Sequence, residues 1–509
     1  MSFPLLSYVV FTPWVGALLL AILRRHLPGP LGRFLPIAFS LSTLAYGLVA
    51  LAYFDPTVTG MQFTEKVSWI AALNVRYHLG LDGLSLVLVL LTGVVSPLAL
   101  VASDRSVRCP AIHGALFLVL QGSALGVFLA LDFFPWFVFW ELSLVPAYFL
   151  IKMWGGPGAN RAAYQFVIYT IGGSAFLLLG FAALYAAMGS FDFLELAGLA
   201  RTGGLAAKLG GGFWPQAVFL GVLLGLAVKV PLFPFHAWLP PAYADAPTGT
   251  SMFLTGVMSK MGAYGFLRLL WPLFPGQLQA AAMPLLALAV GGVVLSAFAA
   301  MKQADLKRMV AYSSINHLSY CLLALFAVAL TGHSTVASAV AAQEAALGGT
   351  ILQLFNHGVS AAALFFCVGV LESRANGRRG LGDFGGVRAA APVFAAFCGI
   401  SLFSSLGLPG LNGFVGEFLI FRGVFGLAPL AAAVATLGLL ATAIFLLTFW
   451  QRVFHGPAAG SGVNFRDLDK VEVITLLPLV ALMFALGVYP QLLAGLINPL
   501  ITQWAASMP

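Results

Sequence analysis

Charged residues are scarce in this chain of 509 residues: only 8% are Asp, Glu, Lys or Arg, against about 25% in an average soluble domain. Hydrophobic residues make up 61%, whereas soluble domains contain about 45–50%. A water-soluble fold cannot bury that much apolar surface. The composition therefore excludes a cytosolic enzyme, a nucleic-acid-binding protein and a secreted module, and it indicates an integral membrane protein surrounded by lipid.

Cysteine is also rare, and its spacing excludes several kinds of site. The chain has four cysteines, at Cys109, Cys321, Cys367 and Cys398. They are far apart, with no CxxC pair and no iron–sulfur or zinc spacing, and we interpret them as small apolar fillers. A P-loop is absent. One G-x-G-x-x-G match at residues 380–385 follows an apolar helix and an arginine cluster instead of a strand, so it does not predict a dinucleotide site.

Long apolar runs fill most of the chain, and each is long enough to cross a hydrocarbon core of about 30 Å as a helix. We count about fourteen, at residues 4–23, 34–53, 82–102, 112–131, 133–151, 163–188, 214–231, 248–271, 278–300, 309–330, 335–371, 391–421, 428–451 and 472–498. The runs do not alternate polar and apolar residues as barrel strands do. The sequence therefore predicts an all-α polytopic membrane protein with about 14 transmembrane helices, the first of them retained.

Lysine and arginine are distributed unevenly between the loops that join these runs. With both termini outside, 17 of the 25 lie on the cytoplasmic side: Arg24, Arg25, Arg33, Arg105, Arg108, Lys152, Arg161, Lys302, Lys307, Arg308, Arg374, Arg378, Arg379, Arg388, Arg452, Arg466 and Lys470. Six lie outside: Lys66, Arg76, Arg201, Lys208, Arg268 and Arg422. Cytoplasmic loops carry the excess of basic residues, so the pattern predicts a bacterial inner membrane protein with periplasmic termini.

Four ionisable residues interrupt the apolar runs. Glu141, Lys260 and Glu417 lie deep within predicted helices, and Lys229 lies beside a predicted helix break. Such residues are costly in lipid and mark pathways for ions or protons. The alternative interpretation is a structural ion pair or a lysine that reaches the membrane surface with its ammonium group.

Two predicted helices are broken. Residues 229–241 contain four prolines, and residues 407–413 contain three glycines and a proline. These residues remove or weaken helical hydrogen bonds, and the freed backbone groups are tolerated in a membrane only beside protein or water. Transporters with inverted repeats place one broken helix in each half, near the functional groups.

Three histidines are further candidates for proton relay. His317 follows Ser313 by one helical turn, and His357 follows Gln353 by one turn, so each has a polar neighbour on its own face. His236 lies in the first break. Histidine changes its protonation near neutral pH, although each could equally be a satisfied core residue. Haem ligation is not expected, because paired histidines on two helices are missing.

Several segments resemble the antiporter-like subunits of respiratory complex I over nearly the whole chain. They are GLDGLSL at residues 80–86, FWELSLVPAYFLI around Glu141, VKVPLFPFHAWLP around Lys229, LTGVMSKMGAYGFLRL around Lys260, DLKRMVAYSSINHLSY around His317 and GLPGLNGFVGEF around Glu417. Among those subunits a glutamate at position 417 resembles the M-type, because the L- and N-types usually have lysine there. The chain also ends without the long lateral helix of the L-type.

The resemblance implies two inverted five-helix repeats, helices 4–8 and 9–13, each with a broken helix. Residues 1–110 would hold helices 1–3, residues 111–275 the first repeat, residues 276–455 the second repeat, and residues 456–509 a loop and helix 14.

The resemblance also implies roles for individual residues. Glu141 would tune the proton affinity of Lys229, Lys260 would be the central relay, and Glu417 would lie in the periplasmic half. The candidate histidines His236, His317 and His357 match the family's hydrated polar axis. Pro241 and Tyr243 depart from the family pattern, which more commonly has aspartate and histidine at these positions.

The function implied is proton translocation driven by quinone reduction in partner subunits. NADH, FMN, iron–sulfur clusters and quinone are expected in those partners, and none in this chain, which would carry out no redox chemistry itself. L-type and N-type antiporter-like subunits are the expected neighbours. Two alternatives are an Mrp-type cation/proton antiporter subunit, and a membrane subunit of a related hydrogenase or carbon-uptake complex.

The predicted topology can be tested by reporter fusions. Because 17 of the 23 loop lysines and arginines fall on one side, a periplasmic reporter fused at Pro509 should be active, and one in the Arg374–Arg388 loop should be silent. A cytoplasmic C-terminus would contradict the helix count.

Overall fold

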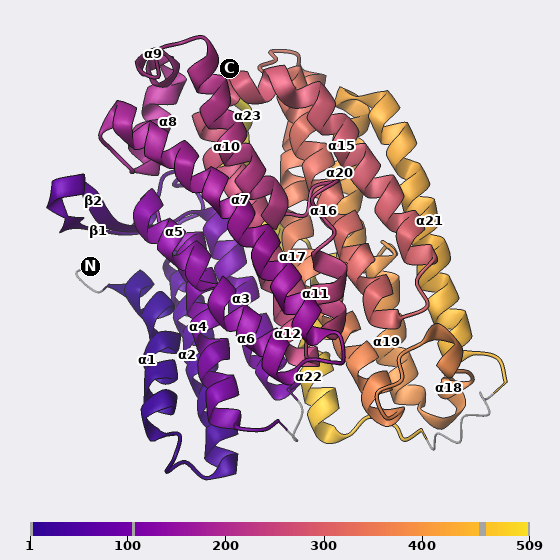
Figure 1. Cartoon of the computed structure of the whole chain (residues 1–509). Helices are drawn as coiled ribbons and strands as arrows, with labels where there is room; N and C mark the ends of the chain where they lie inside the picture. Colours follow the sequence, from indigo (N-terminus) through magenta and orange to yellow (C-terminus); the bar gives the residue numbers. More distant parts are fainter. Residues whose placement is uncertain (1–3, 104–106, 458–464, 507–509) are drawn as a thin grey trace.

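The computed structural model describes residues 4–103, 107–457 and 465–506, and almost all of them are helical (Figure 1). The helices are α1 (Leu5–Leu23), α2 (Gly29–Tyr53), α3 (Gly83–Val101), α4 (Pro110–Leu129), α5 (Phe133–Leu142), α6 (Leu144–Trp154), α7 (Ala159–Met188), α8 (Phe193–Arg201), α9 (Gly204–Lys208), α10 (Phe213–Lys229), α11 (Leu239–Asp245), α12 (Thr248–Phe253), α13 (Ser259–Gly265), α14 (Trp271–Leu273), α15 (Pro275–Met301), α16 (Leu306–Thr331), α17 (Ala337–Arg374), α18 (Val387–Ala390), α19 (Pro392–Ser405), α20 (Asn412–Leu427), α21 (Pro429–Phe454), α22 (Lys470–Val488) and α23 (Gln491–Ala506). The prediction of an all-α membrane protein is confirmed.

Eleven helical segments within the described residues are long and apolar enough to cross a membrane. Each corresponds to one predicted run, with α5 and α6 together forming one of them. The other three predicted runs fall on α10, on the segment from α12 to α14, and on α19 with α20, where the helices are short or interrupted. The count of fourteen crossings therefore stays a prediction, and its three open cases are the irregular helices.

Both predicted helix breaks are present, with slightly different bounds. The first runs from residue 230 to 238, so Lys229 is the last residue of α10 and Pro241 already belongs to α11. Trp238 donates a hydrogen bond to the carbonyl of Val228 (2.9 Å), which satisfies a backbone group near the end of α10.

The second break separates α19 from α20 over residues 406–411. Gly407 and Gly410 adopt the positive φ angles of +77° and +94°, which interrupt the helix there. The Asn356 amide on α17 donates to the carbonyl of Asn412 (2.7 Å), and Ser404 donates to the Asn412 side chain (2.6 Å). The broken helix is thus held against α17 by amide groups that replace its missing helical bonds.

The segment around Lys260 is irregular in a way that the sequence did not predict. α13 is flanked by two π-helical segments, η2 (Leu254–Met258) and η3 (Phe266–Leu270). Single π-turns are rare in proteins overall, and those that occur are often found at functional sites. Tyr243, at the position that departs from the family pattern, donates a hydrogen bond to the carbonyl of Leu254 (2.9 Å) and so contacts η2 directly.

Arg268 corrects one assignment of the sequence analysis. It was expected in an outer loop, but it lies in η3, buried, and its guanidinium forms an ion pair of 2.6 Å with Asp82. The Asp82 carboxylate also caps the first turn of α3. The helix can keep this arginine inside because its charge is neutralised there.

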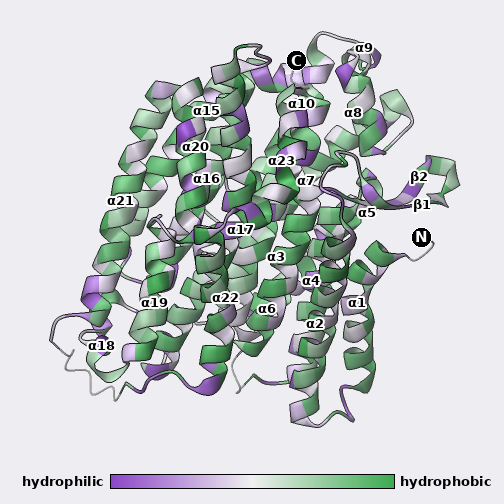
Figure 2. Ribbon diagram, turned by 180° about the vertical axis from the view of Figure 1, so that it is seen from behind, coloured by the Kyte–Doolittle hydropathy of each residue, from purple (hydrophilic) through white to green (hydrophobic). Residues whose placement is uncertain are grey.

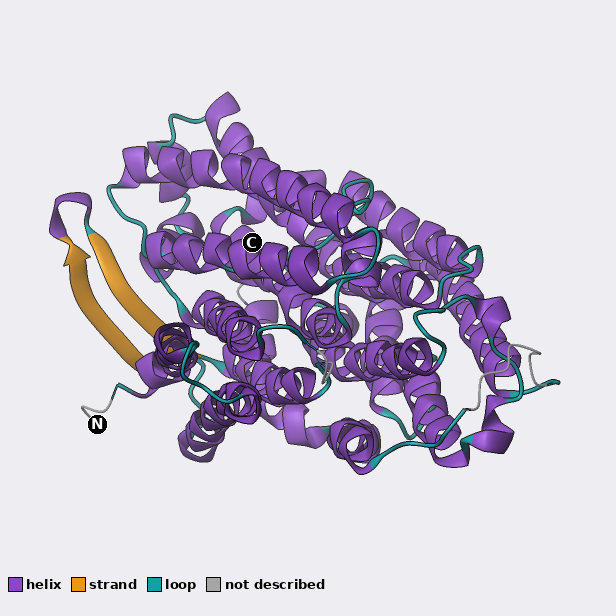
Figure 3. Ribbon diagram, turned by 60° about the horizontal axis from the view of Figure 1, so that its bottom comes forward, coloured by secondary structure: helices purple, strands orange, loops and turns teal. Residues whose placement is uncertain are grey.

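An antiparallel hairpin of β1 (Gln62–Ile70) and β2 (Val75–Leu81) extends from one edge of the bundle, and it was not predicted (Figure 3). Lys66 and His78 both contact the Asp192 carboxylate (2.9 and 2.8 Å). Burial alone would raise the pKa of Asp192, but hydrogen bonds from His78 and Lys66 outweigh it and hold this pKa below its ordinary value. The hairpin is therefore fixed to the loop before α8 by charge.

Charged residues gather at the two ends of the bundle, and the middle of the helices is hydrophobic (Figure 2). At the end that carries α18, Arg374 pairs with Glu472 (2.7 Å) and Lys307 pairs with Glu372 (2.6 Å). These basic residues belong to the predicted cytoplasmic set. Orientation itself stays a prediction, and Arg105 and Pro509 lie outside the described residues.

Candidate functional site

Lys260 lies at the centre of the candidate site, on α13 between the two π-helical segments. Its side chain is fully buried. The Nζ atom donates to the carbonyl of Thr255 (2.5 Å), lies 2.8 Å from Nδ1 of His357, and contacts the Ser259 hydroxyl (3.3 Å). In the described part of the chain no carboxylate forms an ion pair with it. A buried amine of this kind can exchange a proton with the imidazole beside it.

The two central histidines continue the row of polar groups from Lys260. His357 on α17 and His317 on α16 have ring centroids 5.1 Å apart. Nδ1 of His317 lies 3.1 Å from Oε1 of Glu417, which is buried on α20. The structure therefore brings four predicted site residues, Lys260, His357, His317 and Glu417, into one connected row that crosses four helical segments.

The same-helix partners that we expected for these histidines are not their contacts in the structure. Gln353 contacts His317 on the neighbouring helix (3.3 Å) and Glu417 on α20 (3.3 Å), and His357 contacts Lys260. The observed contacts differ from the expected ones because, between closely packed helices, side chains of two different helices can lie nearer to each other than side chains one turn apart on the same helix. Gln353 and Thr255 are site residues whose role the sequence alone did not indicate.

Glycines allow the helices of this row to approach closely. A Cβ atom at Gly349 on α17 would lie 2.6 Å from the backbone nitrogen of Ile420 on α20, and one at Gly416 would lie 2.5 Å from Oε1 of Gln353. Real Cβ atoms do not come this close to other heavy atoms. The absence of side chains at these positions therefore sets the distance between Glu417 and the histidines.

Lys229 and Glu141 form a second, separate group. Lys229 is buried at the end of α10, where its Nζ contacts the Ser143 hydroxyl (3.4 Å) and lies over the Trp140 ring (4.8 Å to the centroid). The two predicted partners interact electrostatically, but among the described contacts no ion pair joins them.

The position of Glu141 on α5 explains why it forms no described ion pair with Lys229. It is half-buried, and Val138 and Val145, three residues before and four after it, are exposed on the same helical face. Its Oε1 atom is buried but makes no hydrogen bond to the described residues. Glu141 thus lies near the edge of the bundle, with one of its carboxylate oxygens buried and without a described partner.

His236 lies apart from both groups. It occupies the break after α10, half-buried, with its ring stacked on Phe233 (5.3 Å between centroids). Its Nδ1 atom has no hydrogen-bond partner in the described chain. The structure thus gives it no direct link to Lys229 or Lys260, and its role stays a prediction.

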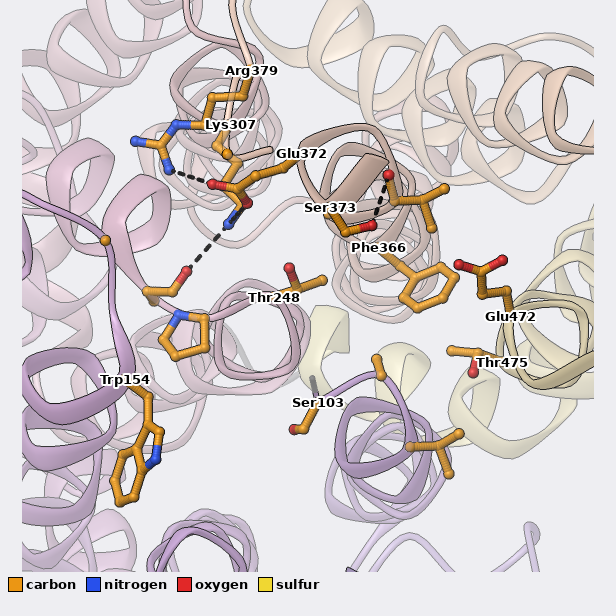
Figure 4. Close-up of a pocket in the computed structure, with 18 of the residues that line it drawn as sticks. Ser103, Trp154, Thr248, Lys307, Phe366, Glu372, Ser373, Arg379, Glu472 and Thr475 are labelled. Atoms are coloured by element: carbon orange, nitrogen blue, oxygen red, sulfur yellow. Dashed lines mark hydrogen bonds and ion pairs between the residues drawn. The ribbon is translucent and has the colours of Figure 1, made fainter. Parts of the chain in front are cut away.

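A polar cavity of about 530 Å³ opens at the end of the bundle near α18 (Figure 4). Its lining includes Thr248, Lys307, Glu372, Arg379 and Glu472. Figure 4 shows Lys307, Glu372 and Arg379 together on one side, with Glu472 across the cavity. The cavity therefore brings basic and acidic groups to the end of α16 and α17.

Two hydroxyl groups lie between this cavity and Lys260. Ser314 follows the cavity residue Lys307 by seven positions on α16, and Thr255 follows the cavity residue Thr248 by seven positions. The two hydroxyls are 2.9 Å apart, and the Thr255 carbonyl accepts from Lys260. Seven residues are two helical turns, or about 10 Å, so both hydroxyls lie on the helix faces that lead inward from the cavity.

No group of three or more His, Cys, Asp or Glu residues that could hold a metal ion occurs in the described ranges. The four cysteines are free thiols, exposed at Cys109 and buried at the other three positions. The candidate site itself consists of an amine, two imidazoles and a carboxylate, groups that can exchange protons.

Comparison with known proteins gives consistent relatives. A family model described as NADH:quinone oxidoreductase/Mrp antiporter, TM, matches residues 130–444. The chain is 36% identical to NADH-quinone oxidoreductase subunit M of Mycobacterium tuberculosis, over 98% of this chain and 93% of the relative.

Solved structures agree with this result. The fold is similar to that of a chain in respiratory complex I from Thermus thermophilus with bound NADH (29% identity, TM-score 0.84, 99% of both chains). It is also similar to a chain in the Mrp complex from Dietzia (20% identity, TM-score 0.83, 100% of both chains), a likeness that concerns the fold alone.

Gly349 offers a test of how tightly the site is packed. Gly349→Ala should destabilise the protein by about 1–3 kcal/mol, because the new methyl group meets the backbone of α20 and a packed interior does not absorb extra volume. The adjacent Gly348→Ala is the matched control, since its methyl group would meet only the tip of Ile501 at 3.3 Å. Thermal unfolding of the purified protein in detergent compares the two. Equal losses in both variants would contradict the close approach.

Proposed function

We propose that this chain, which belongs to the NADH:quinone oxidoreductase/Mrp antiporter transmembrane family, is a proton-translocating membrane subunit of the M-type in an NADH-quinone oxidoreductase. The observation that carries the proposal is the connected row of Lys260, His357, His317 and Glu417. Charged and titratable residues are costly in a membrane interior and are kept there for ion or proton movement. In this complex the chain acts as part of a translocase and leaves electron transfer to its partners.

The row supports stepwise proton transfer. Lys260 can pass a proton to Nδ1 of His357 across 2.8 Å, and His317 can pass one to Glu417 across 3.1 Å. An imidazole takes up a proton on one nitrogen and releases it from the other, so the two neighbouring rings, tilted by 36° to each other, can join these steps. The Nε2 atoms of both histidines have no partner among the described residues, which leaves them available for the step between the rings.

Protons reach Lys260 in this proposal from the cavity at the predicted cytoplasmic end. Lys307 and Glu372 would collect them there, and the hydroxyls of Ser314 and Thr255 would form the link to Lys260. Glu417 would release them toward the periplasmic side. This direction depends on the predicted orientation, with the charged α18 end in the cytoplasm.

Glu141 and Lys229 would receive the signal that drives transport. Glu141 is half-buried at the edge of the bundle, between the exposed Val138 and Val145, which suits a place beside a neighbouring antiporter-like subunit. Those neighbours, of the L- and N-types, and the peripheral subunits with NADH, FMN, iron–sulfur clusters and quinone would supply the energy. His236, in the break after Lys229, is a secondary relay candidate. We place Glu141, Lys229 and Lys260 in the first of two inverted repeats, residues 111–275, and His317, His357 and Glu417 in the second, residues 276–455.

The second candidate function is an Mrp-type cation/proton antiporter subunit, which the fold of the Dietzia relative favours. Glu417 speaks against it, because the D-type subunits of Mrp antiporters usually have lysine at this position. Both functions use the same proton row, so the complex in which the chain resides decides between them.

Purification of the intact complex through a tag on this chain tests the proposed function. We expect NADH- and quinone-reacting subunits with FMN and iron–sulfur clusters to co-purify from a bacterial plasma membrane, and the preparation to reduce quinone with NADH. Mass spectrometry and cofactor spectra report the composition. Recovery of small antiporter subunits without flavin would overturn the proposal.

Glu417→Gln tests the proton row directly. Glutamine keeps the shape and hydrogen-bonding capacity of glutamate but cannot titrate. We expect the variant to assemble and to lose most proton pumping, on the order of tenfold or more, since a general acid–base group contributes about 10²–10⁴-fold to a proton-transfer step. Glu417→Lys should retain part of the activity, because lysine titrates as well.

The matched control is Glu344→Gln on α17, where the carboxylate contacts only the Thr502 hydroxyl among the described residues (2.9 Å). It should pump at the normal rate. Pumping is measured in vesicles with a pH-sensitive dye, after native gels confirm assembly. Full activity of Glu417→Gln would reduce Glu417 to a structural cap of the second break.

A further inference from the structure

Gln353 is the point at which the two titratable groups at the end of the proton row meet. It lies on α17, one turn before His357, and only 1% of its side chain is exposed. Its Nε2 atom is 3.3 Å from Nδ1 of His317 and 3.3 Å from Oε1 of Glu417. Since those two atoms are themselves 3.1 Å apart, one amide group touches both ends of the last transfer step.

The other end of the same amide has no partner. Oε1 of Gln353 is buried without a hydrogen bond to any described residue. An unpaired buried carbonyl is unfavourable, and most native structures contain few of them. It lies against Gly416, where a Cβ atom would approach it to 2.5 Å. The glycine therefore leaves the space that this amide occupies.

The two ends of an amide favour opposite protonation states of the pair. The NH₂ end donates to an ionised carboxylate and to an imidazole nitrogen that carries no proton. The carbonyl end accepts from a protonated imidazole nitrogen or from a protonated carboxyl group. Rotation of the terminal side-chain bond by half a turn exchanges the two ends at nearly the same place, and this bond has a broad, roughly two-fold preference.

We propose that Gln353 is a positioning residue that controls the proton transfer from His317 to Glu417, by presenting its NH₂ end to the empty pair and its carbonyl end to the loaded pair. The proposal rests on the proposed function. In the structure the NH₂ end faces the pair, which corresponds to the empty state. When a proton arrives on His317, the amide turns, and the same rotation pairs its free carbonyl oxygen.

Other titratable groups also surround this pair and enter its pH dependence. Tyr320 lies edge-on to the His317 ring (5.4 Å between centroids), and Cys321 on the same helix contacts the carbonyls of His317 and Thr350. His357 precedes the pair in the row and connects it to Lys260. None of these groups contacts the Gln353 amide among the described hydrogen bonds, so a change at Gln353 acts most directly on the step from His317 to Glu417.

Gln353→Leu removes both ends of the amide and leaves an apolar side chain of similar volume, although one bond shorter. We expect the assembled complex to pump about tenfold more slowly, the scale expected when a hydrogen bond to a charged group is lost. The solvent deuterium isotope effect on pumping should rise, because the proton step becomes rate-limiting. Gln353→Glu adds a second carboxylate beside Glu417 and should shift the pH profile of pumping upward by about one unit, because a neighbouring negative charge favours protonation.

Gln343→Leu is the matched control. Gln343 lies on the same helix, fully buried, and it also has an unpaired Oε1 atom, but its NH₂ group donates to the carbonyl of Gly332 (2.7 Å) and no titratable group contacts it among the described residues. The Gln343→Leu variant should lose about as much thermal stability as Gln353→Leu. Its pumping rate should stay within about twofold of the unchanged complex, because the one hydrogen bond that it loses is to a neutral group away from the row.

The outcomes separate the possible roles of Gln353. Equal pumping by the Gln353→Leu and Gln343→Leu complexes overturns the proposal, and so does a slow Gln353→Leu complex with an unchanged isotope effect and an unchanged pH profile in Gln353→Glu. If Gln353→Leu does not assemble, the pH profile of Gln353→Glu, which retains the size and polarity of glutamine, decides by the same criterion. Failure of the proposed function is recognised separately, by recovery of small antiporter subunits without flavin in the purified complex.

Discussion

The structure depends on a buried amine that has no described carboxylate beside it. In lipid, every polar group must find its partner inside the protein, and Lys260 finds a backbone carbonyl, a hydroxyl and an imidazole. The carbonyl of Thr255 belongs to a π-helical segment, which widens the helix next to the amine. The π-helical distortion and the position of His357 on the neighbouring helix α17 therefore together provide the polar partners of the Lys260 amine. Such an arrangement leaves the proton mobile, whereas a fixed carboxylate partner would hold it.

Close packing of α17 on α20 extends this site to Glu417. Within the second break, the backbone N–H groups of residues 406, 407, 408 and 411 donate to nearby carbonyls, and the mutual hydrogen bonds of Asn356 and Asn412 hold the start of α20 against α17. Because Gly349 and Gly416 lack side chains, the two helices come near enough for Glu417 to reach His317. The break thus interrupts the helix just before α20, and the two glycines set how closely α20 packs on α17.

The sequence revealed the individual site residues better than their partners. An ionisable residue within an apolar run is conspicuous, which is why Lys260 and Glu417 could be predicted, along with the helical fold. Contacts between helices are not encoded in spacing along one helix, so Gln353 was assigned to His357 although it contacts His317 and Glu417. Arg268 was misplaced because its counter-ion, Asp82, is 186 residues away. The π-turns leave no periodic signal, because apolar residues fill a π-turn as readily as an α-helix. The hairpin does leave one, since apolar residues alternate at Val75, Tyr77, Leu79 and Leu81, but a prediction from long apolar runs does not detect it.

The two charged groups differ in a way that suits different tasks. Lys260, His357, His317 and Glu417 are buried and in sequential contact, as conduction of a proton requires. Glu141 is half-buried at the edge, and no described ion pair joins it to Lys229. The groups still lie on touching elements, because a Cβ atom at Gly262 would meet the backbone nitrogen of Val230 at 2.7 Å. Two unit charges about 10 Å apart interact by about 1.7 kcal/mol at an effective dielectric constant of about 20, more than a tenfold change in an equilibrium. A change of charge at the edge can therefore alter proton occupancy in the row without a hydrogen bond between them.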